Sequence, residues 1–533
     1  MSQATLAVMN ATLYTGDKRQ PECGQAMAVS GDRIIAVGTN QEIAALTGPG
    51  TQKLDAGGKL VLPGFIDAHT HLCTGGFQLL SIDLRNAGNE QEFRSQIAAR
   101  AAALPPGQWL TGGNWDHEQW PVPRLPVKEL IDACTPDIPV FVTRLDLHMG
   151  LANSAALRLA GVTKDTPDPA GGSIVRHLAT GEPTGILKDA AMELVWRVLP
   201  KPTDEDYSTA IRAALRHAAS LGITSIQDVT SWDEWKALQA FHRDHGLTTR
   251  LYARTPIQEW SRQQEVLAAA EPGDHWLRLG GVKGFVDGSL GSATALFFEP
   301  YNDAPDEYGL LHDDMHPAEA MQNRLIAADR AGLQASVHAI GDKANYLLLN
   351  MVERLSAANG PRDRRFRIEH AQHLIPPDVE RMASLGIVAS VQPYHAIDDA
   401  RWAGRRLGER TKMAYPFRSL LQAGVPLAFG TDWPVAPLDP LLGLYAAITR
   451  KPFGDGSSSW HPEQCLTARE AVHAYTAAGA YAEYAEQDKG ALSPGKLADF
   501  IVLSRDIFAV PPDDLPSVQV ECTVCGGRIT YQK

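Results

Sequence analysis

The feature that most constrains this chain is an alternation of short apolar strands with amphipathic helices through most of its length. The helices keep a 3.6-residue apolar period, and several strands follow a glycine of the kind that commonly ends a helix. Eight βα units predict a closed (β/α)8 TIM-type barrel, an α/β fold. An open doubly wound sheet is the structural alternative. The expected strands are Leu60–Ile66, Ile223–Gln227, Thr249–Arg254, Leu279–Val286, Gln334–His338, Arg365–His370, Val388–Gln392 and Pro426–Gly430.

The 533 residues exceed one ordinary domain, and the spacing of the strands indicates how they are divided. Both ends of the chain have a pattern of short strands, which predicts a small composite β-sandwich from residues 1–59 with 485–533. The barrel is expected over 60–72 with 210–484. About 150 residues separate its first two strands, far more than a βα loop needs. Residues 73–209 are therefore expected to form an inserted, lid-like α+β domain over the barrel mouth.

Composition narrows the class of protein. There are 49 Lys and Arg against 62 Asp and Glu, a net charge of −13, which disfavours a general nucleic-acid binder. No apolar run approaches the ~20 residues that span a membrane, and the first residues do not resemble a secretory signal. The six scattered cysteines suit a reducing compartment. We therefore expect a cytoplasmic enzyme with no nucleic-acid or membrane partner, and leave open whether it forms a homodimer.

Polar side chains stand at the ends of the predicted strands. His69 and His71 lie two residues apart after the first strand, where both imidazoles project to one face. Alone, this pair is equally consistent with solvated loop histidines. Further polar residues at or within the later strands favour a functional site over solvated loop histidines, because unpaired charges in apolar strands are costly. Divalent metal ions would explain their convergence at one end of the barrel. These residues are Lys283, His338, His370 and Asp432.

The motifs around these residues resemble those of the amidohydrolase superfamily, and within it the branch of N-acyl and N-formyl amide hydrolases that includes N-substituted formamide deformylases. The resemblance covers essentially the whole chain, from Gly64-Phe-Ile-Asp-Ala-His-Thr-His71 to Gly495-Lys-Leu-Ala-Asp499. Branch-specific motifs lie in the insertion and after two barrel strands, and they say little about the substrate. They are Asn114-Trp-Asp-His117, Arg144-Leu-Asp-Leu-His148, Thr166-Pro-Asp-Pro-Ala-Gly-Gly-Ser173, Asp287-Gly-Ser-Leu-Gly-Ser292 and Asp432-Trp-Pro-Val435.

The resemblance implies a pair of metal ions, with zinc expected and a single ion as the alternative. His69, His71 and Asp432 would hold one ion and His338 and His370 the other. A carboxylated Lys283 and a hydroxide would bridge them. The implied reaction is hydrolysis of a C–N bond in a small amide, with Asp432 carrying the proton to the leaving amine. For Lys283 alone, the residues leave open an ordinary salt bridge to Asp287.

We also expect substrate contacts from Trp115, His148, Asp287 and Trp433, because such pockets use aromatic and polar groups. Three alternative functions remain at this stage. An esterase, lactonase or phosphotriesterase could use the same metals. A binding or regulatory relative could keep the fold without turnover, although all six expected ligand positions are filled. A lyase or isomerase on the barrel would need no metal pair.

Overall fold

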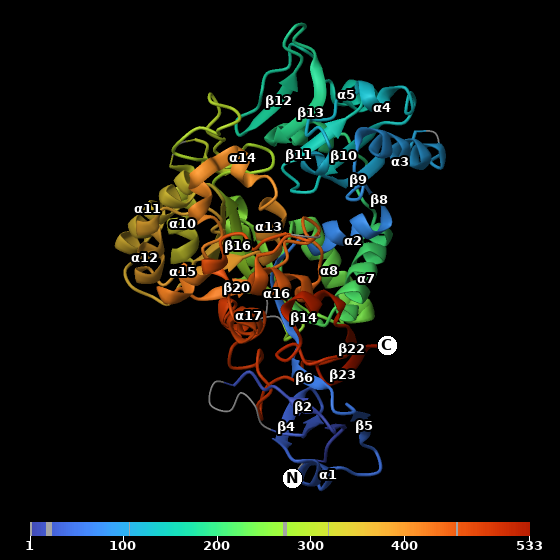
Figure 1. The fold of residues 1–533 in the computed structure, drawn as a ribbon, viewed down its shortest axis with the longest axis vertical. Coiled ribbons are helices and arrows are strands. Elements are labelled where there is room, and N and C mark those ends of the chain that lie inside the picture. Colours follow the sequence, from blue (N-terminus) through green and yellow to red (C-terminus); the bar gives the residue numbers. More distant parts are fainter. Residues whose placement is uncertain (1–2, 18–23, 106, 270–273, 318, 455–456) are drawn as a thin grey trace.

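The computed structural model describes residues 3–17, 24–105, 107–269, 274–317, 319–454 and 457–533. A central barrel carries an inserted domain at one end and a small β region at the other (Figure 1). None of the described helices combines the length and apolar character that crossing a membrane requires.

The barrel consists of eight parallel strands in sequential order, which confirms the predicted fold class. It closes between its last and first strands, where the backbone N–H of Asp432 donates to the carbonyl of His69 at 2.7 Å and that of His71 to Trp433 at 2.8 Å. The strands are β7 (Phe65–Thr70), β14 (Ile223–Val229), β15 (Arg250–Pro256), β16 (Leu277–Phe285), β17 (Gln334–Ala339), β18 (Arg367–His370), β19 (Val388–Val391) and β20 (Leu427–Phe429).

Helices surround the barrel, and local signals in the sequence set their ends. Helices α7 (Asp204–Ser220) and α8 (Trp232–His245) begin with capping boxes at Thr203 and Ser231, which satisfy backbone N–H groups of the first turn. The glycines expected to end helices, such as Gly222 and Gly332, have φ of 79° and 80°, a conformation that favours glycine. The other outer helices include α2 (Leu72–Leu80), α9 (Trp260–Ala269), α10 (Ala320–Arg330), α11 (Asp342–Asn359), α12 (Pro376–Ser384), α15 (Phe417–Gln422), α16 (Pro440–Thr449), α17 (Ala468–Ala474) and α18 (Ala477–Ala482).

The first predicted strand, Leu60–Ile66, is two strands that belong to different sheets. Strand β6 (Leu60–Pro63) pairs with β21 (Phe500–Leu503) in the small β region, and the barrel strand β7 begins only at Phe65. The break falls at Gly64, where a Cβ would lie 2.3 Å from the side chain of Thr224. A continuous apolar run hides this change of sheet, because both segments are buried.

The small β region joins strands from the two ends of the chain. One sheet has the order β2-β6-β21-β22-β23 and the other β4-β3-β1-β5. Figure 1 places this region at the end of the barrel away from the inserted domain. Its remaining elements are β1 (Leu6–Met9), β2 (Thr12–Leu13), β3 (Ala26–Ser30), β4 (Arg33–Gly38), α1 (Asn40–Ala44), β5 (Gln52–Asp55), β22 (Val520–Cys525) and β23 (Arg528–Gln532).

The inserted domain is a six-stranded sheet with its own core, placed between α2 and α7 in the sequence. Asn153 caps α5 (Ser154–Ala160) by accepting from the N–H of Ala156 at 2.9 Å, as expected. The sheet follows the order β12-β13-β11-β10-β9-β8. Its elements are β8 (Ile82–Asp83), α3 (Glu90–Ala102), β9 (Leu110–Trp115), α4 (Glu129–Asp132), β10 (Val140–Arg144), β11 (Met149–Ala152), β12 (Gly172–Arg176), β13 (Pro183–Asp189) and α6 (Glu193–Trp196).

A buried ion pair joins the barrel to the small β region and leads to a prediction about stability. The Arg250 guanidinium donates to both carboxylate oxygens of Asp499, at 2.7 and 2.9 Å. Asp499→Asn leaves the buried cation without its charge partner, and we expect the free energy of unfolding in urea to fall by about 3–5 kcal/mol. Asp488→Asn is the matched control, because the Asp488–Arg33 pair is partly exposed and its loss should cost less than ~1 kcal/mol. Equal effects of the two variants would contradict this role of Asp499.

Candidate metal centre

A cavity of about 1460 Å³ lies at the carboxyl ends of the barrel strands, between the barrel and the inserted domain. The inserted domain contributes Phe141, Arg144 and His148 to its wall. All six residues predicted as metal ligands also line it, although they come from five different strands or strand ends. They are His69, His71, Lys283, His338, His370 and Asp432.

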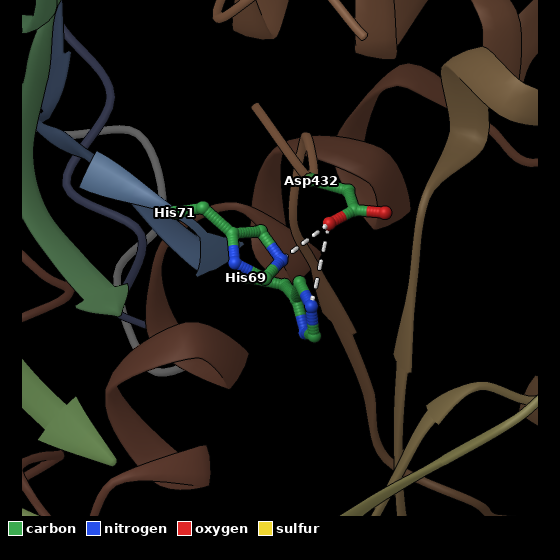
Figure 2. Close-up of side chains that lie close together, drawn as sticks. All are labelled: His69, His71 and Asp432. Atoms are coloured by element: carbon green, nitrogen blue, oxygen red, sulfur yellow. Dashed lines mark ion pairs between the residues drawn. The ribbon is translucent and has the colours of Figure 1, made fainter. Parts of the chain in front are cut away.

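His69, His71 and Asp432 form the tightest group of donor atoms, which we call the first donor group. One carboxylate oxygen, Oδ1 of Asp432, lies 3.4 Å from His69 Nε2 and 3.3 Å from His71 Nε2 (Figure 2). Two ligands on a tetrahedral zinc ion, with metal bonds of ~2.0–2.1 Å, lie ~3.3 Å apart. The spacing and the donor types therefore fit a divalent cation bound among these three side chains.

The position of Asp432 depends on a second, buried aspartate. The side chain of Asp67 accepts from the N–H and hydroxyl of Thr431 at 2.9 and 2.6 Å and from the N–H of His69 at 3.1 Å. It thereby ties the end of β7 to the segment after β20. Burial raises the pKa of Asp67 to about 7. For Asp432, burial opposes the charge, but His69, His71 and His370 outweigh it and hold its pKa well below the usual range.

His69 is oriented by a carboxylate behind it. Its Nδ1 hydrogen bonds to Glu369, which leaves the Nε2 lone pair facing the cavity. Burial opposes the charge of Glu369, but Arg367 and Arg254 outweigh it and keep the pKa of this carboxyl well below its usual value. Both guanidinium groups donate to Glu369 Oε1 at 2.8 Å. A carboxylate–histidine pair of this kind is typical of metal ligands.

His338 and His370 are also held in one tautomer each. His338 Nε2 donates to the carbonyl of Gly288 at 3.0 Å, which leaves the lone pair on Nδ1. His370 Nδ1 donates to Gln392 Oε1 at 2.8 Å, which leaves it on Nε2. The two rings are 4.4 Å apart between centroids. Burial lowers the pKa of His370 to about 3, so its imidazole is neutral and able to bind a cation.

Lys283 does not form the salt bridge with Asp287 that the sequence left open. Its Nζ lies 3.3 Å from His69 Nε2 and is almost fully buried. Burial lowers the pKa of Lys283 to about 7, so a neutral amine is accessible near neutral pH. Asp287 instead accepts three backbone N–H groups, from Leu296, Ile340 and Gly341, at 2.8–3.0 Å.

Of the four residues predicted to contact substrate, one lines the cavity. His148 lines the cavity, its Nδ1 is 2.6 Å from Asp189 Oδ1, and its ring lies 5.2 Å from that of His338. The described residues that line the cavity include none of the other three. Asp287 holds the loops that follow β16 and β17, as its three backbone contacts indicate.

Neither tryptophan occupies the position expected for it. Trp115 packs on Phe93 in the core of the inserted domain and donates to the carbonyl of Val142 at 3.0 Å. Trp433 packs against α2, where a Cβ at Gly75 would lie 2.3 Å from its ring. Both are buried, because these large apolar rings serve packing. The structure therefore places Trp115, Trp433 and Asp287 outside the described lining of the cavity.

Glu369, Asp67 and Arg367 support the predicted ligands from behind, and no motif in the sequence pointed to them. Each is fully buried within a barrel strand. A charged residue inside an otherwise apolar strand was the available signal, as in Arg367-Ile-Glu-His370. This signal marks an unusual position but does not identify its partner, since Glu369 and His69 lie 300 residues apart in the sequence.

Comparisons with known proteins agree with this architecture. The sequence profile described as the amidohydrolase family matches residues 52–531. The Arabidopsis thaliana protein LONG AFTER FAR-RED 3 is 41% identical over 99% of this chain and 92% of its own length. The N-substituted formamide deformylase of Arthrobacter pascens is 29% identical over 99% of this chain and 98% of its own length. A crystal structure of an uncharacterized metal-dependent hydrolase from Pyrococcus horikoshii is 30% identical, covers 95% of this chain and 99% of its own, and has a TM-score of 0.76.

The hydrogen bond behind His69 generates a prediction about metal affinity. Glu369→Gln replaces the carboxylate that orients this imidazole, and we expect zinc affinity to fall by ~10- to 100-fold. Equilibrium dialysis against a zinc buffer measures the zinc affinity of the variant and of the wild type. Glu380→Gln, an exposed position on α12, is the control and should leave the affinity unchanged. Unaltered zinc binding in a folded Glu369→Gln variant would contradict the assigned role.

Proposed function

Because the chain belongs to the amidohydrolase family, we propose that it is a metal-dependent hydrolase that cleaves the C–N bond of a small N-formyl or N-acyl amide. The observation that carries the proposal is the first donor group, in which two imidazole nitrogens and one carboxylate oxygen lie at the spacing of ligands on one ion. The relative named as a formamide deformylase supports the choice of an amide as substrate.

The residues of this chain would bind the cation and transfer the proton. His69, His71 and Asp432 would hold one divalent ion, and His338 and His370 a second, with zinc the expected metal. Bound ions supply Lewis acidity, which polarises the scissile carbonyl and activates water for attack. Asp432 lies at the cavity wall and offers a second oxygen, Oδ2, beside the one nearest the imidazoles. This carboxylate would accept the proton of the attacking water and return it to the leaving amine.

Lys283 would complete the site as a carbamate. The neutral amine attacks the carbon of CO2, a new N–C bond forms and one proton is released, so that the side chain gains a carboxylate with a negative charge. Two facts support this conversion: Lys283 is buried beside His69, and its burial favours the neutral amine. An unmodified ammonium here would repel a cation bound by His69.

The inserted domain would supply substrate contacts through His148. Asp189 fixes this imidazole from behind, and burial of His148 opposes protonation while Asp189 raises its pKa. Apolar side chains, among them Phe141, Leu145, Met192 and Trp196, line another part of the cavity. A cavity of this size with an apolar wall favours an amide that carries a bulky apolar group.

The direct experiment measures turnover on a matched substrate panel. The purified, metal-loaded protein is assayed with N-formyl and N-acyl amides of apolar amines, and with esters, lactones and phosphotriesters of the same groups. We expect kcat/KM to be highest for amides. Hydrolysis restricted to the ester, lactone or phosphotriester members would contradict the proposed C–N specificity.

Asp432 gives the sharpest test of the catalytic assignment. Asp432→Asn removes the proton acceptor, and we expect kcat on the best amide to fall by at least ~10²–10⁴-fold. The fold should persist, because the residue stands at the loop face of the barrel rather than in its packed layers. Asp313→Asn, an exposed position at the rim of the same cavity, is the control. A near-native kcat for Asp432→Asn would remove this residue from the mechanism.

Lys283 gives an independent test of the bridging anion. Lys283→Ala should lose bound metal and activity together, because the carbamate is removed. Added acetate, propionate or bicarbonate should partly restore both by placing a carboxylate in the vacated space. Mass spectrometry under native conditions should detect the added CO2 on the wild-type protein. Full metal content in Lys283→Ala without any added acid would exclude the bridging role.

A further inference from the structure

His312 is an imidazole of the cavity wall that none of the roles above uses. It belongs to the barrel loop that follows β16, and its side chain lines the cavity with 23% of its surface exposed. The ring caps the short 3-10 helix Asp313–Met315, because its Nδ1 accepts from the backbone N–H of Asp314 at 3.1 Å. The proton of the neutral ring is therefore on Nε2. Burial lowers the pKa of His312 to about 4, which keeps the ring neutral at ordinary pH.

The Nε2–H group of His312 is a hydrogen-bond donor that the protein leaves unused. Among the described residues, none accepts a hydrogen bond from this atom, although Nδ1 is satisfied. The atom is also absent from the buried side-chain atoms that lack a partner, so it is not enclosed by protein. A donor with these properties on the wall of a cavity is available to a ligand.

The His312 ring is fixed in place before any ligand binds. It stacks on the Phe285 ring with centroids 4.8 Å apart and an interplanar angle of 30°. The backbone N–H of His312 donates to the carbonyl of Val286 at 2.8 Å. Asp314, which donates its N–H to the ring, also accepts from the N–H of Phe285 at 3.0 Å. A donor held in this way loses little freedom on binding and can discriminate between ligands.

The position of His312 separates its ligand from the scissile bond. Phe285, on which the ring stacks, also contacts the expected metal ligand His338, with centroids 5.4 Å apart. His312 and His338 are thus neighbours of the same aromatic ring. The scissile carbonyl would lie at the ions, which polarise it. The donor of His312 would therefore meet a different part of the substrate.

The charges around His312 favour an uncharged acceptor. Asp189 is the charged side chain with the largest effect on the pKa of His312, and Asp313 adds a second negative charge. The opposing influences come from His148, which is already paired with Asp189, and from Lys283. A carboxylate of the substrate would be repelled by these two acidic side chains, whereas a neutral carbonyl oxygen would not.

We infer that His312 determines substrate specificity, and that its Nε2–H donates a hydrogen bond to an uncharged carbonyl oxygen of the substrate that is not cleaved. The preferred amide then carries a second carbonyl group in its acyl or amine part. The inference rests on the proposed function, because it places the scissile carbonyl at the metal centre. It does not depend on whether the cleaved bond is an amide or an ester.

Binding of matched hydroxamates tests the inference without turnover. A hydroxamate chelates a divalent ion and so occupies the place of the scissile group. The zinc-loaded full-length protein is titrated calorimetrically with alkyl hydroxamates that carry a ketone at successive positions along the chain, and with the same compounds with a methylene in its place. At one position we expect the ketone to bind ~3- to 10-fold more tightly than its methylene counterpart, the gain from one neutral hydrogen bond.

Variants of His312 assign this preference to the imidazole. His312→Phe keeps a ring to stack on Phe285 but removes the donor, and it should bind the ketone and the methylene compound equally. His312→Gln should keep part of the preference, because its amide N–H reaches nearly the place of Nε2–H. His316→Phe is the matched control, since this exposed histidine of the same loop lies outside the described lining of the cavity. It should keep the wild-type preference.

The ratio of the two affinities is the informative quantity, because a general loss of structure would weaken both compounds alike. No preference for the ketone at any position in the wild type would overturn the inference, and this comparison needs no variant. An unchanged preference in a folded His312→Phe protein would also overturn it, as would equal losses in His312→Phe and His312→Gln.

Two further results separate the uncharged acceptor and the metal centre from each other. A hydroxamate with a carboxylate in place of the ketone should bind no better than the methylene compound. Tighter binding of the carboxylate, lost in His312→Phe, would contradict the uncharged acceptor. Failure of every hydroxamate to bind would contradict the proposed metal centre together with this inference. Hydrolysis of esters but not amides, with the ketone preference intact, would contradict the proposed function alone.

Discussion

The charge balance around Glu369 is the interaction on which the metal-binding end of the barrel depends. This carboxylate is fully buried and is kept ionised by Arg254 and Arg367, which are equally buried. Arg367 also donates to the carbonyl of Ala68 at 2.6 Å, next to His69. The network thus joins three barrel strands and fixes one face of a histidine. Removing Glu369 would leave two buried guanidinium groups without this shared charge partner, which is costly.

The site is assembled from parts that lie far apart in the sequence. The barrel supplies the donor atoms, and the inserted domain closes the cavity above them and contributes His148 with its partner Asp189. The inserted domain is also fastened to the barrel loops, since Glu118 pairs with Arg406 at 2.8 Å and with Arg405. Most of the donor side chains are buried at this junction, which strengthens electrostatic interactions at the site.

Metal binding makes opposite demands on the imidazoles and on the carboxylate of the site. Ligand imidazoles must be neutral, and burial lowers the pKa values of His69, His338 and His370 accordingly. The Asp432 carboxylate must stay charged in the same buried environment, and the neighbouring imidazoles hold its pKa well below the usual range. A donor set of this kind has lone pairs available to a cation near neutral pH.

The sequence by itself determined the barrel, and it singled out six polar residues that the structure brings to one cavity, because strand periodicity and polar residues at strand ends are local patterns. It could not tell that Trp115 and Trp433 are packed in buried positions, since an aromatic ring in a branch-specific motif looks the same whether it faces a pocket or a core. It also ran β6 and β7 together as one strand. The partners of Glu369 and Asp67 and the closeness of His395 to Asp432 were decided only by the tertiary structure. The contacts of Glu369 and Asp67 depend on barrel closure, which brings strand ends separated by up to about 360 residues within hydrogen-bond reach, whereas His395 and Asp432 follow the neighbouring strands β19 and β20.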